Sequence, residues 1–113
     1  MGNCSTEHLK GKAKKIADDI CAAFKKRYGE EPDSGGCKTF YSTKEWAARG
    51  ERWGNGAVLV VVYDGGDFYE LLSCNAASYL RPGSFSETMD DLCKKHGCYR
   101  EHLTSWASAL YKI

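Results

Sequence analysis

The stretch AVLVVVY, residues 57–63, decides the fold, because it is an unbroken apolar run in the middle of the chain. Its length and its β-branched valines are typical of a β-strand. Since the run does not alternate with polar residues, both faces of that strand should be buried. We therefore expect residues 57–63 to form the central strand of a sheet. The run is far shorter than the roughly 20 residues that cross a bilayer, so we expect no membrane span.

The residues around this run predict the rest of a small, mainly antiparallel sheet. DGGD, residues 64–67, has the Asp and Gly that tight turns favour, and it predicts a hairpin whose second strand is FYELLSC, residues 68–74. CKTFYS, residues 37–42, reads as another short strand. The final stretch, residues 99–113, fits both helical and strand spacing. We favour a strand at 104–113 that pairs with 57–63.

Two longer helices are predicted to pack on this sheet. Apolar residues recur at helical spacing from about residue 6 to residue 28, with Ser5 or Thr6 as the cap and Gly29 as the ending residue. A second helix is expected at about 85–96. The motif STKE, residues 42–45, is a capping box that predicts a further short helix. The chain therefore reads as one α+β domain, residues 1–113.

Composition sets no strong preference for a partner. The formal net charge is +1, which gives no general attraction to nucleic acid or anionic membrane. The charge is nevertheless segregated. Residues 1–30 hold seven Lys/Arg against four Asp/Glu, whereas residues 61–90 hold one arginine against five acids. The segregation indicates a two-sided molecule.

The chain has six cysteines, many for its length. Without an extracellular context they do not establish a disulfide framework, so we expect a cytoplasmic protein with reduced thiols and no cofactor. CKKHGC, residues 93–98, raises two chemical alternatives. Cys93, His96 and Cys98 could be part of a zinc site, with Cys37, Cys74 or His102 as a fourth ligand, or of a thiol-dependent enzyme.

A structural explanation of CKKHGC is simpler than either alternative. If Gly97 is the left-handed residue that ends a helix, His96 is the C-cap, and Cys93 and Cys98 meet as apolar neighbours. The thiol of Cys93 would then lie at a helix C-terminus, where the helix dipole disfavours a thiolate. We therefore expect no metal and no catalytic residue here.

The remaining candidates are contact residues for a macromolecular partner. Trp46 is expected in the core, whereas Trp53, in the loop ERWGNG, is expected at the surface. Arg49, Arg52 and Trp53 form one predicted contact group, and the acidic group Asp64, Asp67 and Glu70 forms another.

Our leading hypothesis is a small non-enzymatic protein-binding module that acts stoichiometrically as an inhibitor or adaptor, of the kind that phages and mobile elements often carry. The alternative is a nucleic-acid-binding domain that uses Trp53, Arg49 and Arg52, since aromatic rings and arginines stack bases and hold phosphates.

Overall fold

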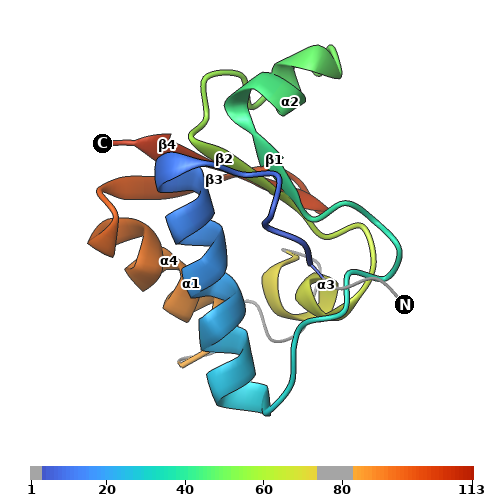
Figure 1. Cartoon of the computed structure of the whole chain (residues 1–113), viewed down its shortest axis with the longest axis vertical. Helices are drawn as coiled ribbons and strands as arrows, with labels where there is room; N and C mark the ends of the chain where they lie inside the picture. The colour runs from blue at the N-terminus through green and yellow to red at the C-terminus, as the bar shows by residue number, and fades with distance from the viewer. Residues whose placement is uncertain (1–3, 74–82) are drawn as a thin grey trace.

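The computed structural model describes residues 4–73 and 83–113, and in these ranges the chain forms an α+β fold, as the sequence predicts. Four strands make one antiparallel sheet in the order β1-β2-β4-β3. Figure 1 shows α2 on one side of this sheet and α1, α3 and α4 on the other. The elements are α1 (Gly11–Tyr28), β1 (Phe40–Ser42), α2 (Thr43–Ala48), β2 (Leu59–Val62), α3 (Asp67–Leu72), α4 (Phe85–Lys95), β3 (Cys98–Thr104) and β4 (Ala107–Lys112).

The predicted central strand is confirmed as β2, which lies between β1 and β4. Every residue of β2 is buried, because its two faces contact different apolar clusters. Val61 pairs with Phe40 of β1, and Leu59 pairs with Leu110 of β4. The expected pairing of the C-terminal stretch with 57–63 is thus confirmed. That stretch contains two strands rather than one, since residues 98–104 form β3 at the edge of the sheet.

The two faces of β2 divide the core. Leu59 and Val61 point into the larger cluster, to which α1, α3 and α4 contribute their apolar residues. Val60 and Val62 point to the opposite face, where Trp46 of α2 covers them together with alanines of β4. Burying an apolar side chain of this size contributes about 1.5–3 kcal/mol, so a strand with two apolar faces can stabilise both layers.

The N-terminal helix is shorter than predicted, beginning at Gly11 rather than near residue 6. Thr6 does not cap it. The Thr6 hydroxyl instead donates to the Asp18 carboxylate at 2.6 Å. The preceding segment folds back along the helix, so that Cys4 and Leu9 join the larger cluster. At the other end Gly29 has a left-handed conformation and ends the helix, as predicted.

The predicted hairpin at 64–67 is wrong, because residues 67–72 form the helix α3 instead of a returning strand. Residue 74 of the predicted strand lies outside the described residues. Phe68 and Leu72 are four residues apart, and both are buried, which is the spacing of one helical face. The glycines of DGGD allow the loop at 64–66 to lie close to the loop at 33–35. A Cβ on Gly66 would lie 2.3 Å from the Asp33 carbonyl oxygen.

The second predicted helix is confirmed as α4, with Ser84 as its N-cap. Gly97 has φ +71° and follows the C-cap His96, so the helix ends where the motif predicts. The Gly97 N–H donates to the Lys94 carbonyl at 3.0 Å. Cys93 and Cys98 are both buried in the larger cluster.

Candidate functional site: a notch lined by three tryptophans

The short helix α2 fixes the position of Trp46. The capping box is formed, because the Ser42 side chain accepts from the Glu45 N–H and the Glu45 side chain accepts from the Ser42 N–H. Trp46 is buried against the sheet, as expected from the sequence. Its indole Nε1–H donates to the carbonyl oxygen of Trp53 at 2.7 Å. This bond ties the loop after α2 to the helix itself.

The loop at 51–56 lies directly on Trp46 and on β3. Gly54 is buried with φ +90°, and a Cβ at this position would lie 2.7 Å from the Trp46 Nε1 and 2.8 Å from a Leu103 methyl group. A side chain larger than hydrogen therefore does not fit between helix and strand. Because Gly54 lies so close to Trp46 and Leu103, the backbone of the loop is fixed there, and this fixes the position of the neighbouring Trp53 at the surface.

All three tryptophans of the chain meet at one small notch. Its volume is about 40 Å³, close to the space of one methyl group or one water. The residues that line it come from α2, the following loop, the adjoining ends of β3 and β4 and the turn between these strands: Trp46, Glu51, Trp53, Leu103, Thr104, Trp106 and Ala107. A notch of this size has room for the tip of an apolar side chain, which would contact the tryptophan rings that line it.

Trp53 and Arg52 are both exposed at the surface beside the notch. Trp53 is 62% exposed, as expected from the sequence, and the Arg52 guanidinium lies 5.2 Å from the centre of the Trp53 ring. Among the described residues, Arg52 has no acidic partner within ion-pair distance.

Arg49, the third member of the predicted group, is bound within the protein. Its guanidinium lies 4.9 Å from the Trp46 ring centre and pairs with Glu51 at 2.8 Å. It also donates to the Tyr41 hydroxyl at 2.9 Å. Arg49 thus supports the aromatic residues of the notch.

The acidic group belongs to a different part of the molecule. Asp64, Asp67 and Glu70 lie at the start of α3, on the side of the sheet opposite α2 (Figure 1). Asp67 is bound within the protein: its carboxylate accepts from the Asp33 N–H at 2.8 Å, and its own N–H donates to the Asp33 carbonyl at 2.9 Å. The two predicted contact groups therefore do not form one surface.

Cys93, His96 and Cys98 each pack or bond within the protein, in contacts that stabilise the fold. His96 Nε2 lies 2.6 Å from the Asp19 carboxylate and joins α4 to α1. Burial raises the pKa of the Cys93 thiol to about 12, which makes it a poor nucleophile at neutral pH. Within residues 4–73 and 83–113, no three His, Cys, Asp or Glu side chains are arranged to hold a metal ion. Cys74, one candidate for a fourth ligand, lies outside these ranges.

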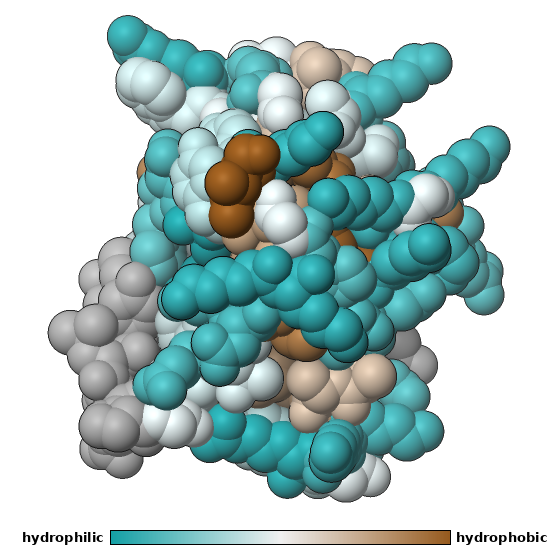
Figure 2. Space-filling model, turned by 90° about the vertical axis from the view of Figure 1, so that its left-hand side faces the viewer, coloured by the Kyte–Doolittle hydropathy of each residue, from teal (hydrophilic) through white to brown (hydrophobic). Residues whose placement is uncertain are grey.

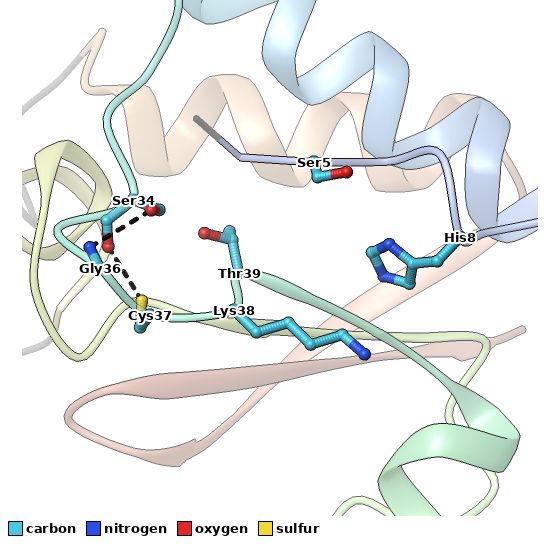
Figure 3. A pocket seen from close by; sticks show the side chains of 7 residues that line it. All are labelled: Ser5, His8, Ser34, Gly36, Cys37, Lys38 and Thr39. Carbon is cyan, nitrogen blue, oxygen red and sulfur yellow. Dashed lines mark hydrogen bonds between the residues drawn. The ribbon is translucent and has the colours of Figure 1, made fainter. Parts of the chain in front are cut away.

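A separate polar pocket of about 400 Å³ lies between the N-terminal segment and the segment before β1 (Figure 3). His8 enters it from one side, with Nε2 2.8 Å from the Phe40 carbonyl oxygen. Lys38 forms an ion pair with Glu45 of the capping box. The residues that line this polar pocket are Ser5, His8, Ser34, Gly36, Cys37, Lys38 and Thr39.

Sequence reasoning finds Trp53 and Arg52 but misses Leu103 and Trp106. These two residues are more than 40 positions away from Trp53 in the chain, and they reach it through the pairing of β3 with β4. No local spacing connects residues so far apart. A concentration of tryptophan is visible in the sequence, but its convergence on one notch is not.

No family model, curated protein or solved structure matches this chain. No helix of the described residues is long and apolar enough to cross a membrane. Figure 2 shows that the side of the molecule nearest α4 and the C-terminus is mainly hydrophilic, with apolar side chains in small patches. The tryptophan notch is the candidate site that combines a hollow in the surface with a largely exposed tryptophan, Trp53.

Proposed function

We propose that this protein is a non-enzymatic binding module that captures a partner protein at the tryptophan notch and acts stoichiometrically, as an inhibitor or adaptor. One observation carries the proposal: all three tryptophans converge on one notch, and Trp53 stands largely exposed beside it. Tryptophan and arginine are enriched among the residues that dominate binding energy at protein interfaces. We also propose that the protein acts in the cytoplasm, in line with the free thiols of its described cysteines.

The notch and its neighbours specify the chemistry of the partner. An apolar side chain of the partner would enter between the tryptophan rings, which exclude water around it. An acidic residue beside it would pair with Arg52, whose guanidinium has no acidic partner within the described residues. The partner is therefore a protein segment in which an apolar residue is flanked by aspartate or glutamate.

A protein partner is favoured over nucleic acid by the charges around the notch. Glu51 lines the notch itself and pairs with Arg49. The exposed basic charge that remains at the loop is small, and the chain as a whole carries only +1. Nucleic-acid binders depend on an excess of basic residues along the phosphate backbone.

The proposal is tested by selecting binders from a displayed library of random peptides and measuring their affinity by calorimetry. We expect selected peptides to share an apolar residue next to an acidic one and to bind at 1:1 stoichiometry. Trp53→Ala should weaken binding about 30-fold or more, as at an interface hot spot. Arg52→Ala should weaken binding less and reduce its salt dependence.

Tyr28→Ala is the matched control, because Tyr28 is an exposed aromatic residue of α1 on the other side of the sheet. This variant should bind the selected peptides as the wild type does. Equal affinity of the wild type and Trp53→Ala would overturn the proposal. Tight binding of single-stranded oligonucleotides, with affinity falling steeply as salt rises, would support the nucleic-acid alternative instead.

A further inference from the structure

A group of cysteines lies beside the polar pocket, away from the tryptophan notch. Cys37 lines the pocket. Cys4 is buried next to it, with the hydroxyl of Thr39, another lining residue, donating to its sulfur at 3.2 Å. The sulfur of Cys21 of α1 lies 4.0 Å from the Cys4 carbonyl oxygen.

Cys37 is the thiol of this group that a small molecule can reach through the pocket. In Figure 3 its sulfur and the Thr39 hydroxyl lie on the same side of their segment, towards the N-terminal segment that carries Ser5. The Cys37 S–H donates to the Ser34 carbonyl at 3.0 Å, which holds the sulfur at this position. The pocket of about 400 Å³ is large enough for a small polar thiol.

Cys4, unlike Cys37, is buried and hardly accessible to a small molecule. Its residue is 9% exposed, and burial raises the pKa of its thiol to about 11, with a smaller contribution in the same direction from the Cys37 thiol. A small molecule in solution therefore reacts poorly with Cys4. A disulfide sulfur already attached to Cys37 would lie near it, because the Thr39 hydroxyl, which contacts the Cys4 sulfur, points to the same side of the segment as the Cys37 sulfur (Figure 3).

We propose that Cys37 is a site of modification by low-molecular-weight polar disulfides and that Cys4 is its resolving thiol. In the first step the Cys37 sulfur attacks the small disulfide, its S–S bond breaks, and one thiol leaves with the proton of Cys37. The product is a mixed disulfide on Cys37. In the second step the Cys4 sulfur attacks the Cys37 sulfur, and the second small thiol leaves with the proton of Cys4. The raised pKa of Cys4 makes this step slow, and only a disulfide held next to Cys4 can undergo it. The two cysteines are then joined by a disulfide.

The pocket explains why a polar thiol compound is favoured over an apolar one. Its wall presents the hydroxyl groups of Ser5, Ser34 and Thr39 and the ring of His8. These groups can bind the carboxylates and amides of a small peptide-like thiol.

The test uses oxidised glutathione as the probe, on the folded chain in a Cys74→Ser background that removes the one thiol outside the described residues. Trypsin places the thiols of the group on separate peptides: Cys4 on 1–10, Cys21 on 16–25 and Cys37 on 28–38. We expect the protein to form a cross-link between peptides 1–10 and 28–38, detected by mass spectrometry. Cys4→Ser should instead accumulate the glutathione adduct on peptide 28–38. Cys4→Ala serves as a second variant if Cys4→Ser does not fold.

Cys98→Ser is the control, because Cys98 is buried in another part of the core and should not affect the cross-link. A dithiol reductant should restore the starting mass. The modification site is refuted if Cys37→Ser gains glutathione as fast as Cys4→Ser does. The role of Cys4 is refuted if the adduct persists on Cys37 of the parent protein without the cross-link.

Discussion

Arg100 of β3 and Asp90 of α4 form an ion pair in which the two partners have very different environments. The Arg100 Nε lies 2.9 Å from the Asp90 carboxylate; the arginine side chain is 4% exposed, and the aspartate side chain is 49% exposed. The guanidinium also contacts the Ser86 hydroxyl and the Met89 sulfur. This pair joins the edge strand to the helix that covers it.

The asymmetry of this pair predicts unequal costs for removing its two members. Asp90→Asn leaves a buried guanidinium without its counter-charge and should lower the free energy of unfolding by about 3 kcal/mol. Arg100→Met leaves an exposed carboxylate that water can solvate, and should cost about 1 kcal/mol or less. Urea unfolding followed by circular dichroism measures both values.

The control for this comparison is Asp91→Asn, which alters an exposed neighbour on the same helix. It should change the stability by less than about 0.5 kcal/mol. The interpretation would be wrong if Arg100→Met were the more destabilising of the two substitutions in the pair.

Gly54→Ala should damage the tryptophan notch directly. The added methyl group would overlap Trp46 and Leu103, and the residue would keep an unfavourable positive φ. We expect a loss of about 2–4 kcal/mol in the free energy of unfolding, from backbone strain and overpacking together. Tryptophan fluorescence should shift to longer wavelength, since all three tryptophans line this notch.

Gly56→Ala separates the two contributions to that loss. Gly56 also has a positive φ, but no atom outside its chain neighbours lies within 4 Å of the added Cβ. Its cost should be confined to backbone strain, about 1–2 kcal/mol, with unchanged fluorescence. Equal costs for the two glycines would show that contact with Trp46 and Leu103 contributes nothing.

Glu45, the capping-box residue of α2, should make stability depend on pH in the acid range. Burial alone raises the pKa of its carboxyl, but bonds from Lys38 and Ser42 outweigh this and hold the pKa at about 2, below the usual 4.5. The folded protein therefore binds this proton less readily than the unfolded chain. The stabilisation by Glu45 is complete above the unfolded pKa and is lost as the pH falls from about 4.5 towards 2.

Glu45→Gln isolates the charge, because glutamine preserves the geometry of the capping box. The stability difference between wild type and this variant should be constant near pH 7 and shrink steadily below about pH 4.5. Thermal unfolding at a series of pH values measures it. A stability difference that stays unchanged down to pH 2 would contradict the prediction.

Local patterns were sufficient where the determining contacts lie close in the chain. The apolar run at 57–63 identifies the central strand, Ser42 and Glu45 identify the start of α2, and Gly97 identifies the end of α4. In each case neighbouring residues supply both the pattern and its physical cause.

Local patterns failed where contacts with distant segments decide the conformation. DGGD has the residues of a hairpin turn, but its glycines allow the loop at 64–66 to approach the loop at 33–35. Phe68 and Leu72 then reach the core as one face of a helix. The preference of short segments for helix or strand is weak, so packing overrides it.

The sequence by itself thus determined the class of fold, the buried central strand and the exposure of Trp53. The tertiary structure alone decided that Trp53 meets Trp46 and Trp106, and that Cys37 lies at a pocket with Cys4 behind it. The physical reason is the same in both cases. A strand or a cap depends on residues a few positions apart, whereas a site forms where pairing and packing bring distant segments together.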